Sequence, residues 1–257
     1  MKRSRLPIWI TVGAMIFFYL PILILVVNSF NASRFGTGWQ GFSLRWYAQL
    51  LHEPEIWLAA RNSLLVALGA TALSLVLGTA AAFALHRFGR SRLQRFHYAL
   101  VYMPLVVPEI LMGISLLMAF AATGVRLGLG TIFLAHVTFC VSFVAMTVLA
   151  RLQDFDDAVV EAARDLGAGW SVTFRRVVLP MIAPGIAAGA LLAFTLSIDD
   201  FVITFFVAGP GSTTLPIRIY SMIKFGSPPL INALSTILLL VTFTAVILSQ
   251  RISSPRR

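Results

Sequence analysis

Charged residues are scarce in this chain. They make up 12% of its 257 residues, whereas 58% are hydrophobic, and the mean hydropathy is +0.88. In a soluble domain the charged residues alone usually make up about a quarter. The chain has too little polar surface for a soluble domain of this length, so we expect lipid to solvate most of it.

Lysine and cysteine are nearly absent. Neither lysine, Lys2 or Lys224, ends a G-x-x-x-x-G-K-[ST] loop, the glycine-rich segment whose backbone holds nucleotide phosphates. The sequence therefore argues against a transporter that carries its nucleotide site on the same chain. Cys140 has no second cysteine to pair with and lies in an apolar run, so we interpret it as a small core residue.

Catalytic and metal-binding patterns are also missing. The sequence has no cluster of histidines at metal-ligand spacing and no nucleophile elbow, which disfavours an integral-membrane enzyme. His136 is interpreted as a hydrogen-bonded packing residue and not as a metal ligand. We expect no catalytic residue, metal or cofactor in this chain.

Six apolar segments of roughly 20 residues recur along the chain, near 8–28, 61–84, 99–122, 131–150, 181–201 and 231–249. About 20 helical residues cross the ~30 Å hydrocarbon core of a bilayer. We therefore predict an all-α, polytopic membrane protein with six transmembrane helices. The first apolar run is too long for a signal peptide and no small-residue cleavage site follows it, so it is expected to remain as a signal anchor.

The net charge of +10 is distributed between the spans. The arginines are not interleaved with stacking aromatics in a soluble module, which argues against nucleic-acid binding. One side of the predicted topology holds Lys2, Arg3, Arg5, Arg87, Arg90, Arg92, Arg95, Arg151, Arg164, Arg175, Arg176, Arg251, Arg256 and Arg257. The other side holds Arg34, Arg45, Arg61, Arg126, Arg218 and Lys224. Because cytoplasmic loops carry the excess of Lys and Arg, both termini are predicted to be cytoplasmic.

A polar segment, EAARDLGAGWSVTFRRVVLP, covers residues 161–180, in the cytoplasmic loop between spans four and five. A helix is predicted up to Leu166, then a glycine turn, then a short helix to Val178 before Leu179-Pro180 opens span five. Small residues and a carboxylate make this segment suitable for close contact with a partner surface. An ordinary loop with solvated charges is the alternative.

The spacing of this segment resembles the EAA motif of ABC-type importer permeases, the loop that docks onto a separate ATPase. Val177 stands where the general motif often has isoleucine. The resemblance implies that the coupling residues are Glu161, Ala162, Ala163, Asp165, Gly167, Leu179 and Pro180. It also implies a partner ATPase that binds ATP and Mg²⁺, and a second permease chain.

Three acidic residues lie in otherwise apolar sequence: Glu109, Asp199 and Asp200. A carboxylate within a span costs roughly 2.5–3.5 kcal/mol, so such residues usually face a pathway or a partner. Helical spacing places Glu109 near the midplane and the aspartates at the outer mouth, two levels of negative charge that suit a long cation. Alternatively, Glu109 is protonated or caps the helix broken by Pro108, and the aspartates pair with Arg218 or Lys224.

Aromatic residues are concentrated in the outer segment between the first two spans, 28–60. Most are interpreted as membrane-interface residues. Trp46 and Tyr47 are candidates to contact ammonium groups through cation–π attraction. A second outer stretch, 208–229, is rich in proline and glycine and is predicted to dip partly into the pore.

A closer resemblance extends over nearly the whole chain, to C-type permease subunits of spermidine/putrescine ABC importers. It rests on Asn28-Ser29-Phe30-Asn31, Ser33-Arg34-Phe35, Trp39-Gln40-Gly41-Phe42, Arg45-Trp46-Tyr47, His136 to Cys140, Glu161 to Ala168, Phe194 to Asp200 and Ile231-Asn232-Ala233-Leu234. The resemblance implies the type I importer permease fold in a bacterial inner membrane. It implies as partners a periplasmic polyamine-binding protein, a homologous B-type permease and a cytoplasmic ATPase dimer. The implied path residues are Trp46, Tyr47, Glu109, Asp199, Asp200 and Tyr220.

These interpretations divide the chain into an anchor helix with its outer loop (1–60), a permease domain (61–250) containing the coupling loop 154–180, and a basic tail (251–257). Two other functions remain compatible with the sequence. A secondary cation transporter or channel explains the acids but leaves residues 161–180 without a role. An ABC permease for another substrate explains the loop but not the acids.

Overall fold

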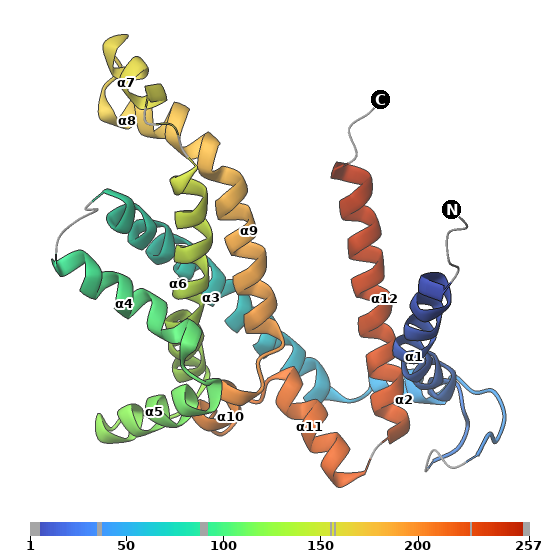
Figure 1. Cartoon of the computed structure of the whole chain (residues 1–257). Coiled ribbons are helices and arrows are strands. Elements are labelled where there is room, and N and C mark those ends of the chain that lie inside the picture. The colour runs from blue at the N-terminus through green and yellow to red at the C-terminus, as the bar shows by residue number, and fades with distance from the viewer. Residues whose placement is uncertain are drawn as a thin grey trace. The chain divides into compact units, whose positions relative to one another are not determined.

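The computed structural model describes residues 6–34, 38–87, 92–154, 156, 158–226 and 228–253 (Figure 1). Apart from turns, short irregular loops and one isolated β-bridge between Asn31 and Phe42, these residues are helical. The predicted all-α class is therefore confirmed. The basic positions at 2, 3, 5, 90, 256 and 257, together with Asp157, lie outside the described residues.

Twelve α-helices and one π-helical turn are described. They are α1 (Leu6–Ser29), α2 (Arg45–Leu51), α3 (Pro54–Arg87), α4 (Arg92–Val106), α5 (Glu109–Ala122), α6 (Leu129–Gln153), α7 (Ala158–Asp165), α8 (Trp170–Thr173), the π-helical turn Phe174–Val178, α9 (Leu179–Ile198), α10 (Val202–Val207), α11 (Leu215–Phe225) and α12 (Pro228–Ser253).

Contacts divide the chain into two compact units. The first consists of Met1–Trp57 with Arg218–Arg257, and the second of Leu58–Ile217. Within the first unit, α12 packs against α1 and α2. Within the second, α6 packs against α4, α9 and α10, and α10 also packs against α5. These units are defined by contacts between residues and not by function. They therefore do not test the predicted domain boundaries at residues 60 and 250, which stay a prediction.

Four helical segments among the described residues are long and apolar enough to cross a membrane: Pro7–Ser29, Pro54–Arg87, Leu129–Gln153 and Trp170–Ile198. They correspond to the predicted first, second, fourth and fifth spans. The sixth predicted span lies in α12, whose shorter apolar part is Pro229–Thr244. The described part of the chain thus has four spans, or five if the bent pair of α4 and α5 counts as one.

The predicted third span, 99–122, is not one straight helix. Its two halves, Leu93–Val106 and Glu109–Ala122, are bent by 111° at the break between them. Pro108 explains the break, because proline lacks a backbone N–H and disfavours helical geometry in the residue before it. Glu109 thus lies directly after the break, and its depth in the membrane stays a prediction.

Helix α6 forms the core of the second unit. Its Ile132, Cys140, Val144 and Val148 are fully buried, and Cys140 is the small core residue predicted. Glycines let neighbouring helices approach it closely. A Cβ atom at Gly78 of α3 would lie 2.7 Å from the Val144 Cβ and 2.9 Å from the Val141 carbonyl oxygen. Such close approach excludes any side chain at Gly78 unless a helix moves.

We therefore expect Gly78→Ala to lower the stability of the purified protein by about 1–3 kcal/mol, because the added methyl group overpacks the contact between α3 and α6. Thermal unfolding in detergent measures this. Gly13→Ala is the matched control, since no atom lies within 4 Å of an added Cβ there, and helix propensity gives it a gain of up to about 1 kcal/mol. Equal unfolding temperatures for the two variants would contradict the packing account.

Candidate functional site

The second unit contains a cavity of about 280 Å³ where α5, α6 and α9 meet. Its lining consists of Glu109, Phe139, Phe143, Leu196, Asp199, Asp200, Phe201 and Val202. All three acids that the sequence marked out therefore line one space. That they form two levels along a path stays a prediction.

Glu109 is the first residue of α5 and directly follows the break at Pro108. A carboxylate in the first turn of a helix is favoured by the helix dipole. The Glu109 side chain is exposed and makes no hydrogen bond or ion pair within the described part of the chain. The alternative that it caps the broken helix is thus not supported by any hydrogen bond, and its carboxylate is open to a ligand.

Asp199 follows the last residue of α9 and is exposed. Its side chain makes neither an ion pair nor a hydrogen bond to another of the residues that the structure describes. The cavity thus contains two carboxylates, one from α5 and one from the end of α9, that have no cationic partner in the part of the chain that the structure describes. Phe139, Phe143 and Phe201 supply aromatic surface beside them.

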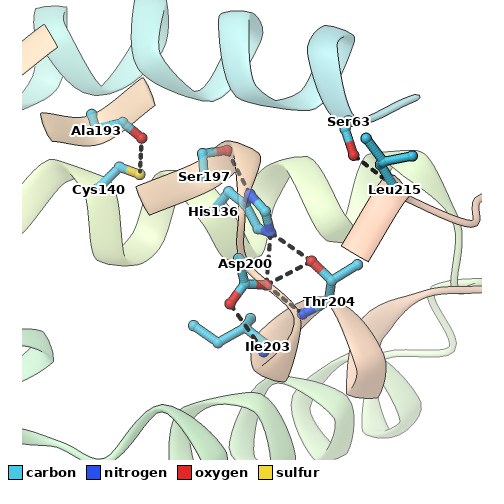
Figure 2. A network of polar contacts seen from close by, with 9 residues as sticks. All are labelled: Ser63, His136, Cys140, Ala193, Ser197, Asp200, Ile203, Thr204 and Leu215. Carbon is cyan, nitrogen blue, oxygen red and sulfur yellow. Dashed lines mark hydrogen bonds and ion pairs between the residues drawn. The ribbon is translucent and has the colours of Figure 1, made fainter. Parts of the chain in front are cut away.

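Asp200 has a different environment, although it is the next residue. Its Oδ2 atom accepts hydrogen bonds from the Thr204 backbone N–H (2.8 Å) and the Thr204 hydroxyl (2.6 Å), and lies 3.2 Å from His136 Nε2. Its Oδ1 atom accepts from the Ile203 N–H (3.3 Å). Figure 2 shows these contacts converging on the carboxylate. The Asp200 side chain is only 5% exposed.

These contacts correct one alternative raised from the sequence. Asp200 is paired with His136 in place of Arg218 or Lys224. Arg218 instead forms an ion pair with Glu55, at 2.7 Å within the first unit. Sequence analysis missed Thr204, although an aspartate ahead of the apolar run 202–207 is a signal for a helix start. The sequence gives no local signal for the contact between Asp200 and His136, because the two residues are 64 positions apart.

His136 lies in the first half of α6, and its side chain is 1% exposed. Nε2 lies 2.9 Å from the Thr204 hydroxyl oxygen, and Nδ1 lies 2.7 Å from the Ser197 hydroxyl oxygen. The prediction that His136 is a hydrogen-bonded packing residue is confirmed. The residue joins α6 to the end of α9 and the start of α10.

The three aromatic candidates lie in the first unit. Trp46 is buried, its indole N–H donates to the Asn31 carbonyl oxygen (2.8 Å), and Arg45 lies over its ring at 4.1 Å. The Tyr47 hydroxyl is 2.6 Å from the Ser29 hydroxyl. Tyr220 is 45% exposed. Trp46 and Tyr47 therefore stabilise the outer loop, and a role for any of the three on a path stays a prediction.

Residues 161–180, predicted to contact the ATPase, are called the coupling segment below. With the start of α7, they fold as the predicted pair of helices with a glycine turn. Helix α7 ends in a Schellman motif: the Ala168 N–H donates to the Ala163 carbonyl oxygen (3.1 Å) and the Gly167 N–H to that of Arg164 (2.9 Å). Gly167 has φ +84°, a conformation that favours glycine. The second helix differs from the prediction in running through a π-helical turn into α9 without a break.

The surface of this segment is open. Glu161, Ala162, Asp165 and Gly167 are exposed, Ala163 is half-buried, and no residue of α7 is buried. Leu179 and Pro180 are exposed at the start of α9. Leu166 is 89% exposed and Trp170 is 64% exposed, on either side of the glycine turn. Large apolar side chains displayed on a polar turn are typical of a surface that contacts another protein.

Curated relatives are similar to this chain over most of its length. The spermidine/putrescine transport system permease protein PotC of Escherichia coli (strain K12) is 44% identical over 237 residues, which cover 92% of this chain and 89% of that protein. The putrescine transport system permease protein PotI of the same strain is 43% identical over 264 residues, covering 99% and 94%. The PotC protein of Haemophilus influenzae is 40% identical and covers 92% of each chain.

Solved structures agree in fold. A chain of a bacterial ABC transporter involved in the import of the acidic polysaccharide alginate superimposes with a TM-score of 0.76 at 15% identity, covering 99% of both chains. A chain of the MetNI methionine ABC transporter gives a TM-score of 0.63 at 21% identity, covering 78% of this chain and 96% of that one.

At 15% and 21% identity, these solved structures establish the fold only and do not identify the transported substrate. The family model described as binding-protein-dependent transport system inner membrane component matches residues 74–257. Together with the open coupling segment and the apolar spans, this match shows that the chain belongs to that family, the multi-pass inner-membrane permeases of binding-protein-dependent importers.

Proposed function

We propose that this chain is the permease subunit of an ATP-driven importer that moves polyamines from the periplasm to the cytoplasm. The observation that carries the proposal is a pair of carboxylates, Glu109 and Asp199, which line one cavity with three phenylalanines and have no cationic partner among the described residues. Carboxylates attract the ammonium groups of a polyamine, and aromatic faces attract them by cation–π interaction while contacting the methylene chain.

The cargo named for the relatives supports the same substrate class. Relatives at 44% and 43% identity are named for spermidine/putrescine and for putrescine transport. Because these two sequence identities are so similar, they do not favour spermidine over putrescine as the substrate. The cavity of about 280 Å³ is open and lined by two free carboxylates, which suits one end of an aminoalkyl chain. Both polyamines have such an end.

Coupling to ATP hydrolysis takes place through the segment 161–180. The chain carries no P-loop sequence, so we propose that ATP and Mg²⁺ bind to a cytoplasmic ATPase dimer that contacts this segment. The exposed Leu166 and Trp170 supply apolar contacts, and Glu161 and Asp165 supply charge. ATP-driven closure of the dimer then moves this segment and, through the continuous helix Trp170–Ile198, the residues at the far end of α9.

The assembled transporter has further partners and a defined orientation. We propose a homologous second permease chain and a periplasmic polyamine-binding protein, with both termini of this chain in the cytoplasm. The bent pair of α4 and α5 then serves as the third of six spans and α12 as the sixth, as in a type I importer permease. Fourteen basic residues on the side of the coupling segment, against six on the other, support this orientation.

A secondary cation transporter remains the second candidate, because the same two carboxylates suit any cation pathway. The open coupling segment favours the ATP-driven importer, since a secondary transporter gives those residues no partner. Uptake of radiolabelled spermidine and putrescine in cells lacking this chain tests the proposal. Complementation must restore uptake, and depleting the partner ATPase must abolish it. Uptake that continues without the ATPase would establish the second candidate instead.

Neutralising either free carboxylate should impair transport. We expect Glu109→Gln and Asp199→Asn each to reduce polyamine uptake by about tenfold, since a charge-assisted hydrogen bond contributes roughly 1.5–3 kcal/mol. Initial rates with labelled spermidine measure the loss. Glu53→Gln is the control, because Glu53 lies in the outer segment and is hydrogen-bonded to Gln49. Wild-type rates in both cavity variants would exclude Glu109 and Asp199 from the pathway.

Disturbing the glycine turn should impair coupling and leave the cavity intact. Because Gly167 has φ +84°, Gly167→Val forces a side chain into a strained conformation that costs about 1–2 kcal/mol, and we expect less ATPase to co-purify with the chain. Gly169→Ala is the matched control, since Gly169 has φ −66° and no atom lies within 4 Å of an added Cβ. Equal amounts of ATPase with both variants would argue against this turn as the coupling element.

A further inference from the structure

The adjacent residues Asp199 and Asp200 line the same cavity but have opposite surroundings. We propose that they have different roles: Asp199 binds the ammonium group of the substrate, whereas Asp200 does not contact the substrate. Asp200 instead belongs to a positioning unit with His136, Ser197 and Thr204, which we call the His136 unit. This inference rests on the proposed function and deepens it.

The hydrogen bonds of Asp200 leave little room for a ligand. Its two oxygen atoms already accept from the Ile203 and Thr204 backbone N–H groups and the Thr204 hydroxyl, with His136 Nε2 at 3.2 Å. An ammonium group would have to approach a side chain that is only 5% exposed and whose Oδ2 atom already has three partners. Asp199 is exposed and has no ion pair or hydrogen bond to another of the described residues, so a cation reaches it without breaking such a contact.

The direction of the hydrogen bonds explains how the unit is held together. The Thr204 hydroxyl donates its hydrogen to Asp200, so it accepts from His136 Nε2. Nε2 must therefore carry a hydrogen, because both of its neighbours are acceptors toward it. The opposite nitrogen, Nδ1, pairs with the Ser197 hydroxyl at 2.7 Å. Figure 2 shows the His136 ring between Ser197 on one side and Asp200 with Thr204 on the other.

This arrangement fixes the short turn that presents Asp199. Only residues 199–201 separate the end of α9 at Ile198 from the start of α10 at Val202. The His136 unit holds the turn from both sides, through Ser197 on α9 and Thr204 on α10, and joins it to α6. With Asp200 held inward, the neighbouring Asp199 is left facing the cavity.

The same unit sets the distance between the two free carboxylates. Helix α10 packs against α5, the helix that begins with Glu109. A Cβ atom at Gly113 of α5 would lie 2.7 Å from the ring of Phe206 and 3.4 Å from the Ile203 Cα, so the two helices are in close contact. A shift of α10 therefore moves Glu109 and Asp199 relative to each other. His136, buried in α6, acts on substrate affinity only through these neighbours.

The test compares KM and Vmax for radiolabelled spermidine uptake in cells that contain the full transporter with variants of this chain. We expect Asp199→Asn and Asp200→Ala each to raise KM by about tenfold, and Asp200→Asn to raise it by only about threefold. Asparagine retains an oxygen that accepts from Thr204 and His136, so it partly rescues the positioning role without the charge. A KM for Asp200→Asn as high as that for Asp199→Asn would show that the two aspartates do not have different roles, and would overturn the inference.

A second comparison separates positioning from a general loss of folding. Thr204→Val removes the hydroxyl that links Asp200 to His136, and we expect it to raise KM by about fivefold, with Thr204→Ser returning KM toward the wild-type value. In the Asp199→Asn background Thr204→Val should have little further effect, because the residue that the unit positions has already lost its charge. The same proportional rise in both backgrounds, or a loss of Vmax and membrane abundance alone, would overturn the inference.

The outcome also distinguishes this inference from the proposed function. If the complemented wild-type cells accumulate neither spermidine nor putrescine, the proposed function is wrong and the inference falls with it. If wild-type uptake is normal and Asp200→Asn behaves like Asp199→Asn, the function stands and only the inference is wrong.

Discussion

The buried carboxylate of Asp200 is the constraint on which the cavity depends. A buried charge without partners costs several kcal/mol, so this side chain must keep its donors wherever the helices move. Those donors come from the start of α10 and from His136 in the first half of α6. Asp200 therefore joins the turn after α9 to α6 and α10, and in the proposed arrangement it sets the positions of the two open carboxylates, Glu109 and Asp199.

In the proposed function, the part of the chain that binds the polyamine is separate from the part that contacts the ATPase. The continuous helical segment Trp170–Ile198 has the open coupling segment at one end and Asp199 directly after the other. Small residues on α9 let it lie close to α6: a Cβ at Gly185 would meet the Arg151 side chain at 2.9 Å, and one at Gly189 would lie 3.4 Å from the Val144 Cα. Two closely packed helices of this kind transmit a displacement better than a flexible loop.

Properties that depend on composition and local spacing were predictable from the sequence. Hydropathy located α1, α3, α6 and the Trp170–Ile198 segment, because lipid requires about 20 apolar residues wherever the chain crosses it. The glycine turn at Gly167 followed from local backbone preference, and the cost of burying charge singled out Glu109, Asp199 and Asp200. Long-range geometry was not predictable: no local pattern joins His136 to Asp200, and none places Glu109 around the same cavity as the two aspartates.

The most direct test of this account is an experimental structure of the complete transporter, this chain with its second permease and ATPase dimer, bound to spermidine. The account predicts extended density for the polyamine in the cavity, with ammonium groups against Glu109 and Asp199 and with Asp200 still bound to His136 and Thr204. Density that bypasses this cavity, or an Asp200 carboxylate turned away from His136 onto the polyamine, would contradict it.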